Sequence, residues 1–206
     1  MLTGMKDEWK EIEFEIVLHK ETLSGIYYKI KTFEEIGNLL DDHIVNTQMM
    51  AFSPFKAHFE EEISEWENNL RHMLDVLEEW MKVQADWMYL QPIFESKDIA
   101  KQLADESKKF GNINKFWKRE MGAIIKSPNT MKTCLKEGLL EDLRDVNEKL
   151  EVIRKALAAY LEKKRAQFSR FYFLADEDLL EILSEAKNPI MVQPHLAKIF
   201  ENINRI

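Results

Sequence analysis

The sequence has few of the residues that interrupt helices, and almost no cysteine. Its 206 residues include 6 glycines, 5 prolines and 1 cysteine. Glycine and proline supply most tight turns, so their scarcity argues against a sandwich or a barrel. The single cysteine, Cys134, cannot form an intrachain disulfide, which fits a reducing compartment.

The sequence also lacks a long apolar run and an excess of positive charge. No apolar run approaches the roughly 20 residues that cross a bilayer, and residues 1–10 have no secretory core. Lysine and arginine number 29 against 37 aspartates and glutamates, for a net charge of -8. Because an acidic surface repels phosphate backbones and nothing in the chain suits a bilayer, we expect neither nucleic acid nor membrane as a partner.

What the sequence does contain favours helices, after a short β segment. Apolar residues make up 45% and charged residues 32%, with 10 methionines, a composition typical of amphipathic helices. Near the N-terminus, apolar and polar residues alternate from Ile12 to Leu18. A turn over residues 22–25 and the aromatic, β-branched run 26–30 follow. We predict a β-hairpin here, which must pack on helices to be stable.

Two long helices are predicted from apolar residues spaced by three and four. A shorter one comes first, from Phe33 to about Met50, begun by the capping pair Thr32 and Glu35. Ser53-Pro54 then starts a helix of about 36 residues that only Gln84 interrupts. Its apolar positions are Phe55, Phe59, Ile63, Trp66, Leu70, Leu74, Leu77, Trp80 and Trp87. The second long helix follows Gly138, with Leu139, Leu143, Val146, Leu150, Ile153, Leu157, Tyr160, Leu161 and Phe168.

Shorter helices are expected elsewhere. Helix breaks are predicted at Gly111-Asn112 and at Ser127-Pro128. These two segments are also the most flexible in the sequence and so the candidates for a hinge. One helix should run from Asp176 to about Lys187, and a last one from Pro194 to the end. The predicted fold is mainly α: an elongated multi-helix bundle with two long helices and a short N-terminal β-hairpin. We divide it into a hairpin-containing segment, 1–31, and a helical bundle, 32–206.

Searches for chemistry predict no catalytic, cofactor-binding or metal-binding residue. The phosphate-binding motif G-x-x-x-x-G-K-[ST], the motif G-x-G-x-x-G and the nucleophile motif G-x-S-x-G are all missing. No histidine has a carboxylate three residues before it, as helical di-iron sites require. Cys134 is expected to be a buried residue that fills space in the core. It would be a nucleophile only with a histidine base nearby. The acidic runs 41–42 and 176–178 are expected to be solvated or to complement helix dipoles.

The remaining candidates are structural or docking residues. Tryptophans on one helical stripe are expected to pack in the core. The basic cluster 163–165 with Arg170 lies beside aromatics, which suits a helix C-terminus, a nucleic-acid site or a surface for an acidic protein. We expect the apolar stretch 171–174 to be pinned between elements; the alternative is an exposed docking surface. The candidates are Trp66, Trp80, Trp87, Tyr89, Phe94, Arg165, Arg170, Phe171 and Phe173.

Several motifs together resemble one family. Gln84 followed by Trp87-Met88-Tyr89-Leu90-Gln91-Pro92-Ile93-Phe94 is similar to a signature of dynein heavy chains. Tyr160-Leu161-Glu162-Lys163-Lys164-Arg165 with 168–174 resembles a later stretch of that family, and 180–184 and 192–196 continue in the family's order. These motifs are similar to those of axonemal dyneins, especially the single-headed inner-arm types, more than to those of cytoplasmic dynein. Ser169 and Ala104 stand where the family usually has proline or a step into proline.

The resemblance implies a function that composition does not. It implies the linker, a mechanical element that arches over the AAA+ ring of the same heavy chain and swings during the power stroke. ATP and Mg would bind elsewhere in a much longer parent motor, and microtubules would be an indirect partner. Other axonemal dynein subunits are possible partners, and the implied location is the cytoskeleton of a cilium or flagellum. The alternative is a non-motor helical scaffold or tethering protein.

Overall fold

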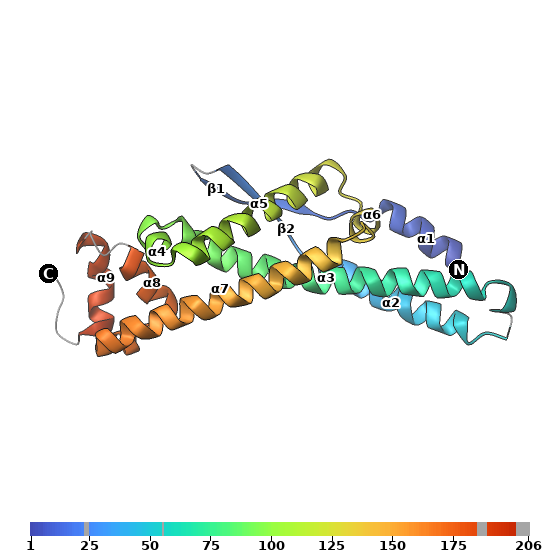
Figure 1. The fold of residues 1–206 in the computed structure, drawn as a ribbon. Helices are drawn as coiled ribbons and strands as arrows, with labels where there is room; N and C mark the ends of the chain where they lie inside the picture. Colours follow the sequence, from blue (N-terminus) through green and yellow to red (C-terminus); the bar gives the residue numbers. More distant parts are fainter. Residues whose placement is uncertain (23–24, 55, 185–188, 201–206) are drawn as a thin grey trace. The chain divides into compact units, whose positions relative to one another are not determined.

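The computed structural model describes residues 1–22, 25–54, 56–184 and 189–200. Within these ranges the chain forms nine α-helices, two 3₁₀ helices and a two-stranded antiparallel hairpin (Figure 1). The prediction of a mainly α fold with an N-terminal hairpin is therefore confirmed. None of the described helices is long and apolar enough to cross a membrane.

The chain divides into two compact units. Unit 1 comprises Met1–Ala85 and Lys115–Asn147, and unit 2 comprises Asp86–Asn114 and Glu148–Ile206. Three helices, α3, α5 and α7, contribute residues to both units. The boundary that we place at residue 31 from the sequence stays a prediction.

Unit 1 begins with a helix that the sequence patterns did not predict, α1 (Leu2–Glu11). It is held by Trp9, which is fully buried and donates its indole N–H to Nδ1 of His43 at 2.9 Å. His43 lies on α2 (Glu34–Ala51), the helix expected from Phe33 to Met50. The N-cap residue of α2 is Phe33 and no side chain caps it, so the expected capping role of Thr32 with Glu35 is wrong. The Thr32 hydroxyl only accepts a hydrogen bond from the Glu34 N–H, at 3.2 Å.

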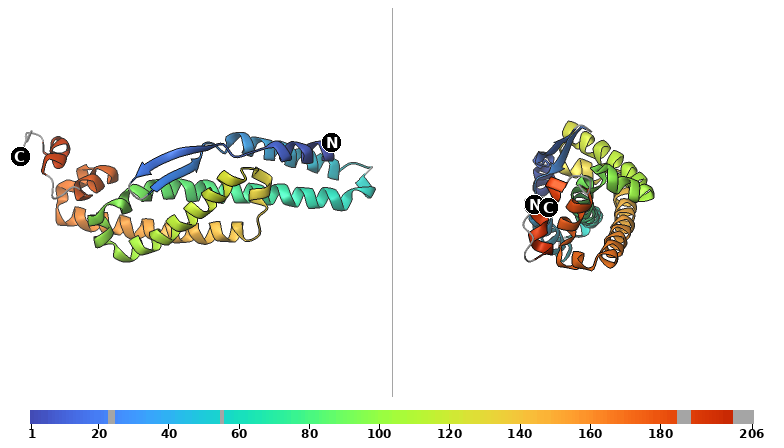
Figure 2. Two further views of the ribbon diagram at one scale, coloured as in Figure 1. Left: turned by 90° about the horizontal axis from the view of Figure 1, so that it is seen from above. Right: turned by 90° about the vertical axis from the view of Figure 1, so that its left-hand side faces the viewer.

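The hairpin pairs β1 (Ile16–Thr22) with β2 (Gly25–Ile30); Figure 2 shows it from two further sides. Its first strand begins at Ile16, so the expectation of a strand from Ile12 is wrong. The reason is that residues 12–14 pair with residues 128–130 instead. The Phe14 N–H donates to the carbonyl of Pro128 at 2.8 Å, and the Thr130 N–H donates to that of Ile12 at 2.9 Å. The turn residues 23–24 lie outside the described residues.

The first long helix, α3 (Glu60–Glu95), has the expected 36 residues but is shifted along the chain. It begins after a 3₁₀ turn, η1 (Lys56–His58), rather than at Pro54. Three glutamates in its first turn complement the helix dipole, which favours this later start. It continues through Pro92, which lies in its last turn. Phe59 is 56% exposed, so its place on the buried stripe is wrong, and Phe55 lies outside the described residues.

The predicted break at Gly111-Asn112 is wrong, because α5 (Ala104–Lys126) runs through it unbroken. A glycine inside a helix costs about 1 kcal/mol. Burying one large apolar side chain contributes about 1.5–3 kcal/mol, and this helix buries Phe110, Ile113, Trp117, Met121 and Ile124.

The helix break at Ser127-Pro128 is confirmed. The segment is nevertheless held by hydrogen bonds. The side-chain N–H₂ of Asn129 lies 3.0–3.3 Å from the carbonyls of Trp9, Lys10 and Ile12. After α6 (Thr130–Cys134), Gly138 with φ +77° precedes the second long helix, α7 (Leu139–Gln167). Along its predicted apolar stripe, residues 139–161 are buried except the half-buried Tyr160, whereas Phe168 is 41% exposed.

Unit 2 also contains four short elements. One, α4 (Lys97–Gln102), follows α3, and the other three follow α7: η2 (Ser169–Phe173), α8 (Asp176–Ser184) and α9 (Pro189–Ile199). Helix α8 begins at Asp176 as predicted, and its expected end at Lys187 lies outside the described residues. Helix α9 begins at Pro189, so the predicted start at Pro194 is wrong. Proline suits the first helical position, and Pro189 offers that signal five residues earlier. The expected end at residue 206 also lies outside the described residues.

Candidate functional site

The most connected group of candidate residues lies where α7 ends in unit 2. We call this group the C-terminal joint: the last turns of α7, then η2, α8 and α9 (Figure 1). Helix α9 packs against both α8 and η2. The joint contains four of the candidates from the sequence: Arg165, Arg170, Phe171 and Phe173.

Arg165 connects the end of α7 to the start of α8. Its guanidinium donates to the carbonyl of Leu174 at 3.0 Å and to the carboxylate of Asp176 at 2.7 Å. Only 14% of the arginine side chain is exposed, so this ion pair is less screened than a surface pair. A bond of this kind fixes where the chain turns after η2.

Arg170 connects η2 to the end of α9. It donates to the carbonyl of Ile199 at 3.2 Å, and its guanidinium lies 4.8 Å from the ring centroid of Phe200. A cation is favourable at a helix C-terminus because it meets the last carbonyls and the negative end of the dipole. Arg170 thus lies at a helix C-terminus, where the helix-terminus interpretation places cations, whereas Arg165 bonds to the start of α8.

The aromatic stretch 171–174 is only partly buried. Phe171 is half-buried, and its ring packs edge-on against Phe168 with centroids 4.9 Å apart. Leu174 is buried, but Phe173 is 74% exposed and Tyr172 is 54% exposed. The expectation that all four residues are packed between elements is therefore wrong for Phe173 and Tyr172. Successive residues of a 3₁₀ turn point about 120° apart, so they cannot share one buried side.

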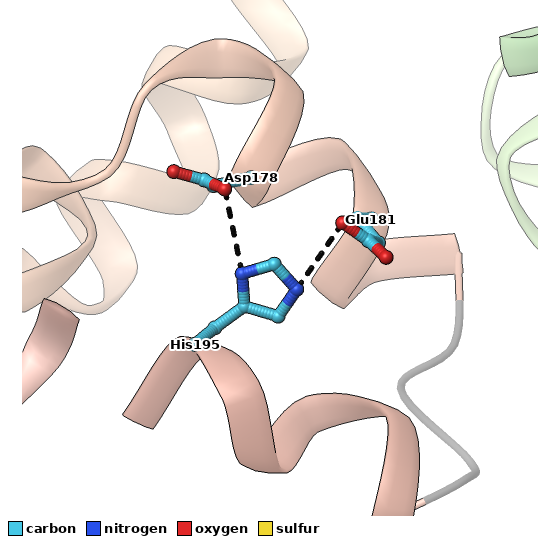
Figure 3. A group of neighbouring side chains, drawn as sticks. All are labelled: Asp178, Glu181 and His195. Carbon is cyan, nitrogen blue, oxygen red and sulfur yellow. Dashed lines mark ion pairs between the residues drawn. The ribbon is translucent and has the colours of Figure 1, made fainter. Parts of the chain in front are cut away.

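A buried histidine between two carboxylates joins α8 and α9 (Figure 3). His195 on α9 is 5% exposed. Its Nδ1 lies 3.5 Å from Asp178 and its Nε2 lies 3.3 Å from Glu181, both on α8. Lys198, one turn after His195, donates to both oxygens of Asp178 at 2.8 and 2.9 Å. The Lys198 ammonium, and to a lesser degree His195, lowers the pKa of Asp178 below its usual value.

The same three residues have the composition of a metal site, since one ligand atom from each lies within 4.8 Å of the others. Their geometry favours ion pairs instead. The two carboxylates face different nitrogens of one imidazole ring, whereas an ion would bind a single ring nitrogen. Lys198 already neutralises Asp178. We therefore describe the cluster as a clasp between two helices.

The other candidates lie on α3: the three tryptophans are buried, whereas Tyr89 and Phe94 are half-buried. Trp66 and Trp80 in unit 1 are each 1% exposed, and Trp87 in unit 2 is fully buried. Trp87 donates to the side-chain oxygen of Asn114 at 3.1 Å. Tyr89 is half-buried, and burial raises its pKa, with a further contribution from Asp176. Phe94 stacks on Phe110 at 5.2 Å. These positions agree with core packing.

Cys134 is buried in unit 1, as expected for filler. Burial raises the pKa of its thiol to about 12. At neutral pH such a thiol is almost entirely protonated, and the thiolate is the form that attacks. The nucleophile alternative therefore has no support from the environment of Cys134.

Comparison with known proteins gives matches over the whole chain. A family described as "Dynein heavy chain, N-terminal region 2" matches residues 1–206. "Dynein axonemal heavy chain 1" of Rattus norvegicus is 46% identical over 205 residues, which is 100% of this chain and 4% of the relative. The Homo sapiens protein of the same name is also 46% identical, over 100% of this chain and 5% of the relative.

A more distant match comes from an alga. "Dynein-1-beta heavy chain, flagellar inner arm I1 complex" of Chlamydomonas reinhardtii is 42% identical over 199 residues, which is 96% of this chain and 4% of the relative. The chain thus spans about one twentieth of the length of these relatives.

Proposed function

Since this chain belongs to the dynein heavy chain family, as its N-terminal region 2, we propose that it is the linker of an axonemal dynein. In this role it is a mechanical lever that arches over the AAA+ ring of the same heavy chain and swings during the ATP-driven power stroke. The observation that carries the proposal is the match over residues 1–206, together with 42–46% identity to the three relatives named above. The family resemblance of the motifs is confirmed by these matches.

The packing of the helices supports a load-bearing role. Helices α3 and α7 have 36 and 29 residues, and each carries a buried apolar stripe. Close-packed interiors are poorly compressible and transmit strain. The ends of the elements are fastened by directed bonds, including Asn129 in unit 1 and Arg165 in unit 2. Such an assembly passes force along its helices with little loss.

In this role the chain itself would not bind or hydrolyse ATP. The described residues offer no activated nucleophile, and the sequence has no phosphate-binding loop, so ATP and Mg would bind elsewhere in the heavy chain. We propose the ring of the same chain as the direct partner, with microtubules as an indirect one. Other axonemal dynein subunits are further candidates. The place of action would be the axoneme of a cilium or flagellum.

A helix-breaking substitution in the parent heavy chain tests the lever. Ala159 is exposed on α7, so Ala159→Pro kinks the helix without removing a core side chain. We expect microtubule gliding velocity to fall severalfold while basal ATP hydrolysis is retained. Ala159→Ser, at the same position, is the matched control and should leave both unchanged.

Three outcomes would contradict the proposal. Unchanged gliding with Ala159→Pro would mean that α7 does not act as a lever. Micromolar binding of ATP and Mg²⁺ to this chain, measured by calorimetry, would favour an enzyme. A loss of gliding and hydrolysis in equal proportion would mean that the substitution damages the ring and not a lever.

A further inference from the structure

The hairpin of unit 1, drawn in Figure 2, has one edge that helices cover. This is the edge of β2. There the side chain of Gln84 on α3 binds both main-chain groups of Ile30. The indole N–H of Trp117 on α5 donates to the carbonyl of Tyr28 at 3.1 Å. The main-chain groups of β2 that point away from β1 are therefore bound by α3 and α5.

The pairing register shows which groups of β1 point away from β2. Ile16 lies opposite Ile30, and Leu18 lies opposite Tyr28. In an antiparallel pair, two opposite residues either exchange hydrogen bonds or both turn their main-chain groups outward. Because Ile30 and Tyr28 bond outward, Ile16 and Leu18 also present their N–H and C=O groups outward, at the outer edge of β1.

The same edge is already used for strand pairing a few residues earlier. Residues 12–14 form a short antiparallel bridge with residues 128–130. The Phe14 N–H donates to the Pro128 carbonyl at 2.8 Å. Phe14 is two residues before Ile16, so both point to the same edge. Within the described ranges, no strand continues this pairing to Ile16 and Leu18. The outer edge is thus occupied at its start and open after it.

The open stretch has the properties of a strand-pairing site. Residues 16–18 are Ile-Val-Leu, without charge or proline, and the Leu18 side chain is 57% exposed. An open apolar strand edge is a template for another strand. The register shifts between Leu18 and Lys20, as in a β-bulge, so the regular edge offers room for a short segment only.

The charges of the hairpin are mainly positive. Its two strands carry Lys20, Glu21 and Lys29, and Lys118 of α5 adds a third cation beside β2. Together with burial, Lys29 and Lys20 lower the pKa of His19. An acidic side chain is therefore favoured here over a basic one. A second copy of β1 would bring another His19 and Lys20 to the same place.

We propose that the open edge of β1 pairs with a short extended segment from another part of the same heavy chain, which adds a third strand to the hairpin. Hydrogen bonds to the main chain of Ile16 and Leu18 would hold the segment. Its side chains would alternate, because successive residues of a strand face opposite sides. They would be apolar on the face of Leu18 and acidic on the face of Lys29.

The source of the segment rests on the proposed function. The relatives are about twenty times longer than this chain, so most of a parent heavy chain lies outside it. The first part of the same edge is already paired with the same polypeptide, at residues 128–130. Tethering also raises the effective concentration of such a segment, so a few main-chain hydrogen bonds are enough.

A peptide titration with amide exchange tests the pairing. The probe is a peptide of about seven residues that alternates valine and glutamate. The matched control has the same side chains but a methyl group on every amide nitrogen. We expect the probe to bind this chain and to slow hydrogen exchange at Ile16 and Leu18 at least about fivefold, and at Val17, whose N–H faces β2, much less. The control should do neither. Binding without protection of Ile16 and Leu18 would overturn the proposal.

Substitutions at Leu18 separate main-chain pairing from side-chain contact. Leu18→Pro removes an outward N–H and no bond to β2, so the hairpin should stay folded and bind the probe at least about fivefold more weakly. Leu18→Val is the matched control, because it keeps the N–H and an apolar side chain, and it should bind as the unsubstituted chain does. Circular dichroism checks folding. Equal binding by both folded variants would overturn the proposal, and amide exchange in the unsubstituted chain decides if Leu18→Pro does not fold.

A third peptide, with lysine in place of glutamate, tests the acidic chemistry. It should bind more weakly than the probe, and the difference should shrink in high salt. Binding of the probe should also raise the pKa of His19, measured by NMR, because a nearby carboxylate favours the charged imidazole. Equal binding of the two peptides would overturn the assignment of an acidic segment.

The source is tested in the full heavy chain. A photo-crosslinking amino acid in place of Leu18 should join to an acidic segment of the same polypeptide. A crosslink to a second heavy chain or to another subunit, or no crosslink, would overturn the proposed source. These results are independent of the gliding assay with Ala159→Pro, so failure of the strand pairing and failure of the lever can be told apart.

Discussion

The side-chain amide of Gln84 forms two hydrogen bonds with the main chain of Ile30. Its oxygen accepts from the Ile30 N–H at 3.0 Å, and its nitrogen donates to the Ile30 carbonyl at 2.9 Å. Both residues are buried. A glutamine that only interrupts an apolar stripe in the sequence is thus the residue that fixes the end of the hairpin on α3.

Replacing Gln84 by methionine should destabilise unit 1. Methionine has similar volume but cannot pair with the two main-chain groups of Ile30, which would stay buried. Leaving such groups unpaired costs about 1–3 kcal/mol each, so we expect a loss of about 2–6 kcal/mol in the free energy of unfolding. Urea denaturation followed by circular dichroism measures it, and a loss below about 1 kcal/mol would contradict the assignment.

Gln91 offers the opposite case in unit 2. It is 2% exposed, and neither its side-chain oxygen nor its nitrogen has a hydrogen-bond partner among the described residues. Gln91→Met removes two buried polar groups without removing a bond, so the free energy of unfolding should stay equal or rise by about 1 kcal/mol. The same urea experiment checks it, with Gln84→Met as the comparison. A loss similar to that of Gln84→Met would show that Gln91 is paired.

The two phenylalanines of η2 should respond differently to truncation. Phe171 is half-buried against Phe168, so Phe171→Ala should cost about 1–3 kcal/mol, below the range for a fully buried ring. Phe173 is 74% exposed, so Phe173→Ala should change stability by less than about 0.5 kcal/mol. Chemical denaturation of both variants distinguishes them. Equal losses would mean that Phe173 packs in solution.

Cys134 should not react with thiol reagents in the folded protein. It is fully buried, and burial raises the pKa of its thiol to about 12. We expect reaction with a colorimetric disulfide reagent at pH 8 to be limited by opening of unit 1, and to become fast in denaturant. A native rate equal to the denatured rate would contradict the burial.

The helices could be predicted from the sequence, because periodicity reports which face is buried. The stripes through Trp66 and Leu150 fall on α3 and α7 as expected. Helix boundaries were less predictable, because they depend on contacts distant in sequence. Residues 12–14 look like the start of the hairpin strand, yet they pair with residues 128–130. Gly111 looks like a break, yet packing on both sides of it keeps α5 continuous.

The C-terminal joint was only half predictable. Arg165 and Arg170 stood out as cations beside aromatics, but each also donates to a main-chain carbonyl, of Leu174 and Ile199, that no pattern identifies. The spacing of the clasp residues can be recognised in the sequence. Asp178 and Glu181, and likewise His195 and Lys198, are three residues apart, which puts each pair on one helix face. That the two faces meet is a property of the folded chain.

The clasp should make the stability of unit 2 depend on acidity. The pKa of Asp178 is lowered from the ordinary value of 3.8, chiefly by its hydrogen bond to Lys198 and also by His195. For a carboxyl whose folded pKa is depressed, the stabilisation is complete above the unfolded value and is lost as pH falls through the folded pKa. The contribution of the Asp178–Lys198 bond should therefore be complete above pH 3.8 and decline as the pH falls below it.

Lys198→Met provides the measurement. Removing the ammonium should lower stability at pH 7 and make the decline between about pH 4 and pH 2 shallower than in the unsubstituted chain, because the folded pKa of Asp178 moves back toward its ordinary value. Urea titrations at several pH values give both quantities. In an Asp178→Asn background, the same lysine substitution should leave the acid slope unchanged, since the titrating group is gone. If Lys198→Met leaves the slope unchanged with Asp178 present, the bond between these residues does not hold α9 to α8 in solution.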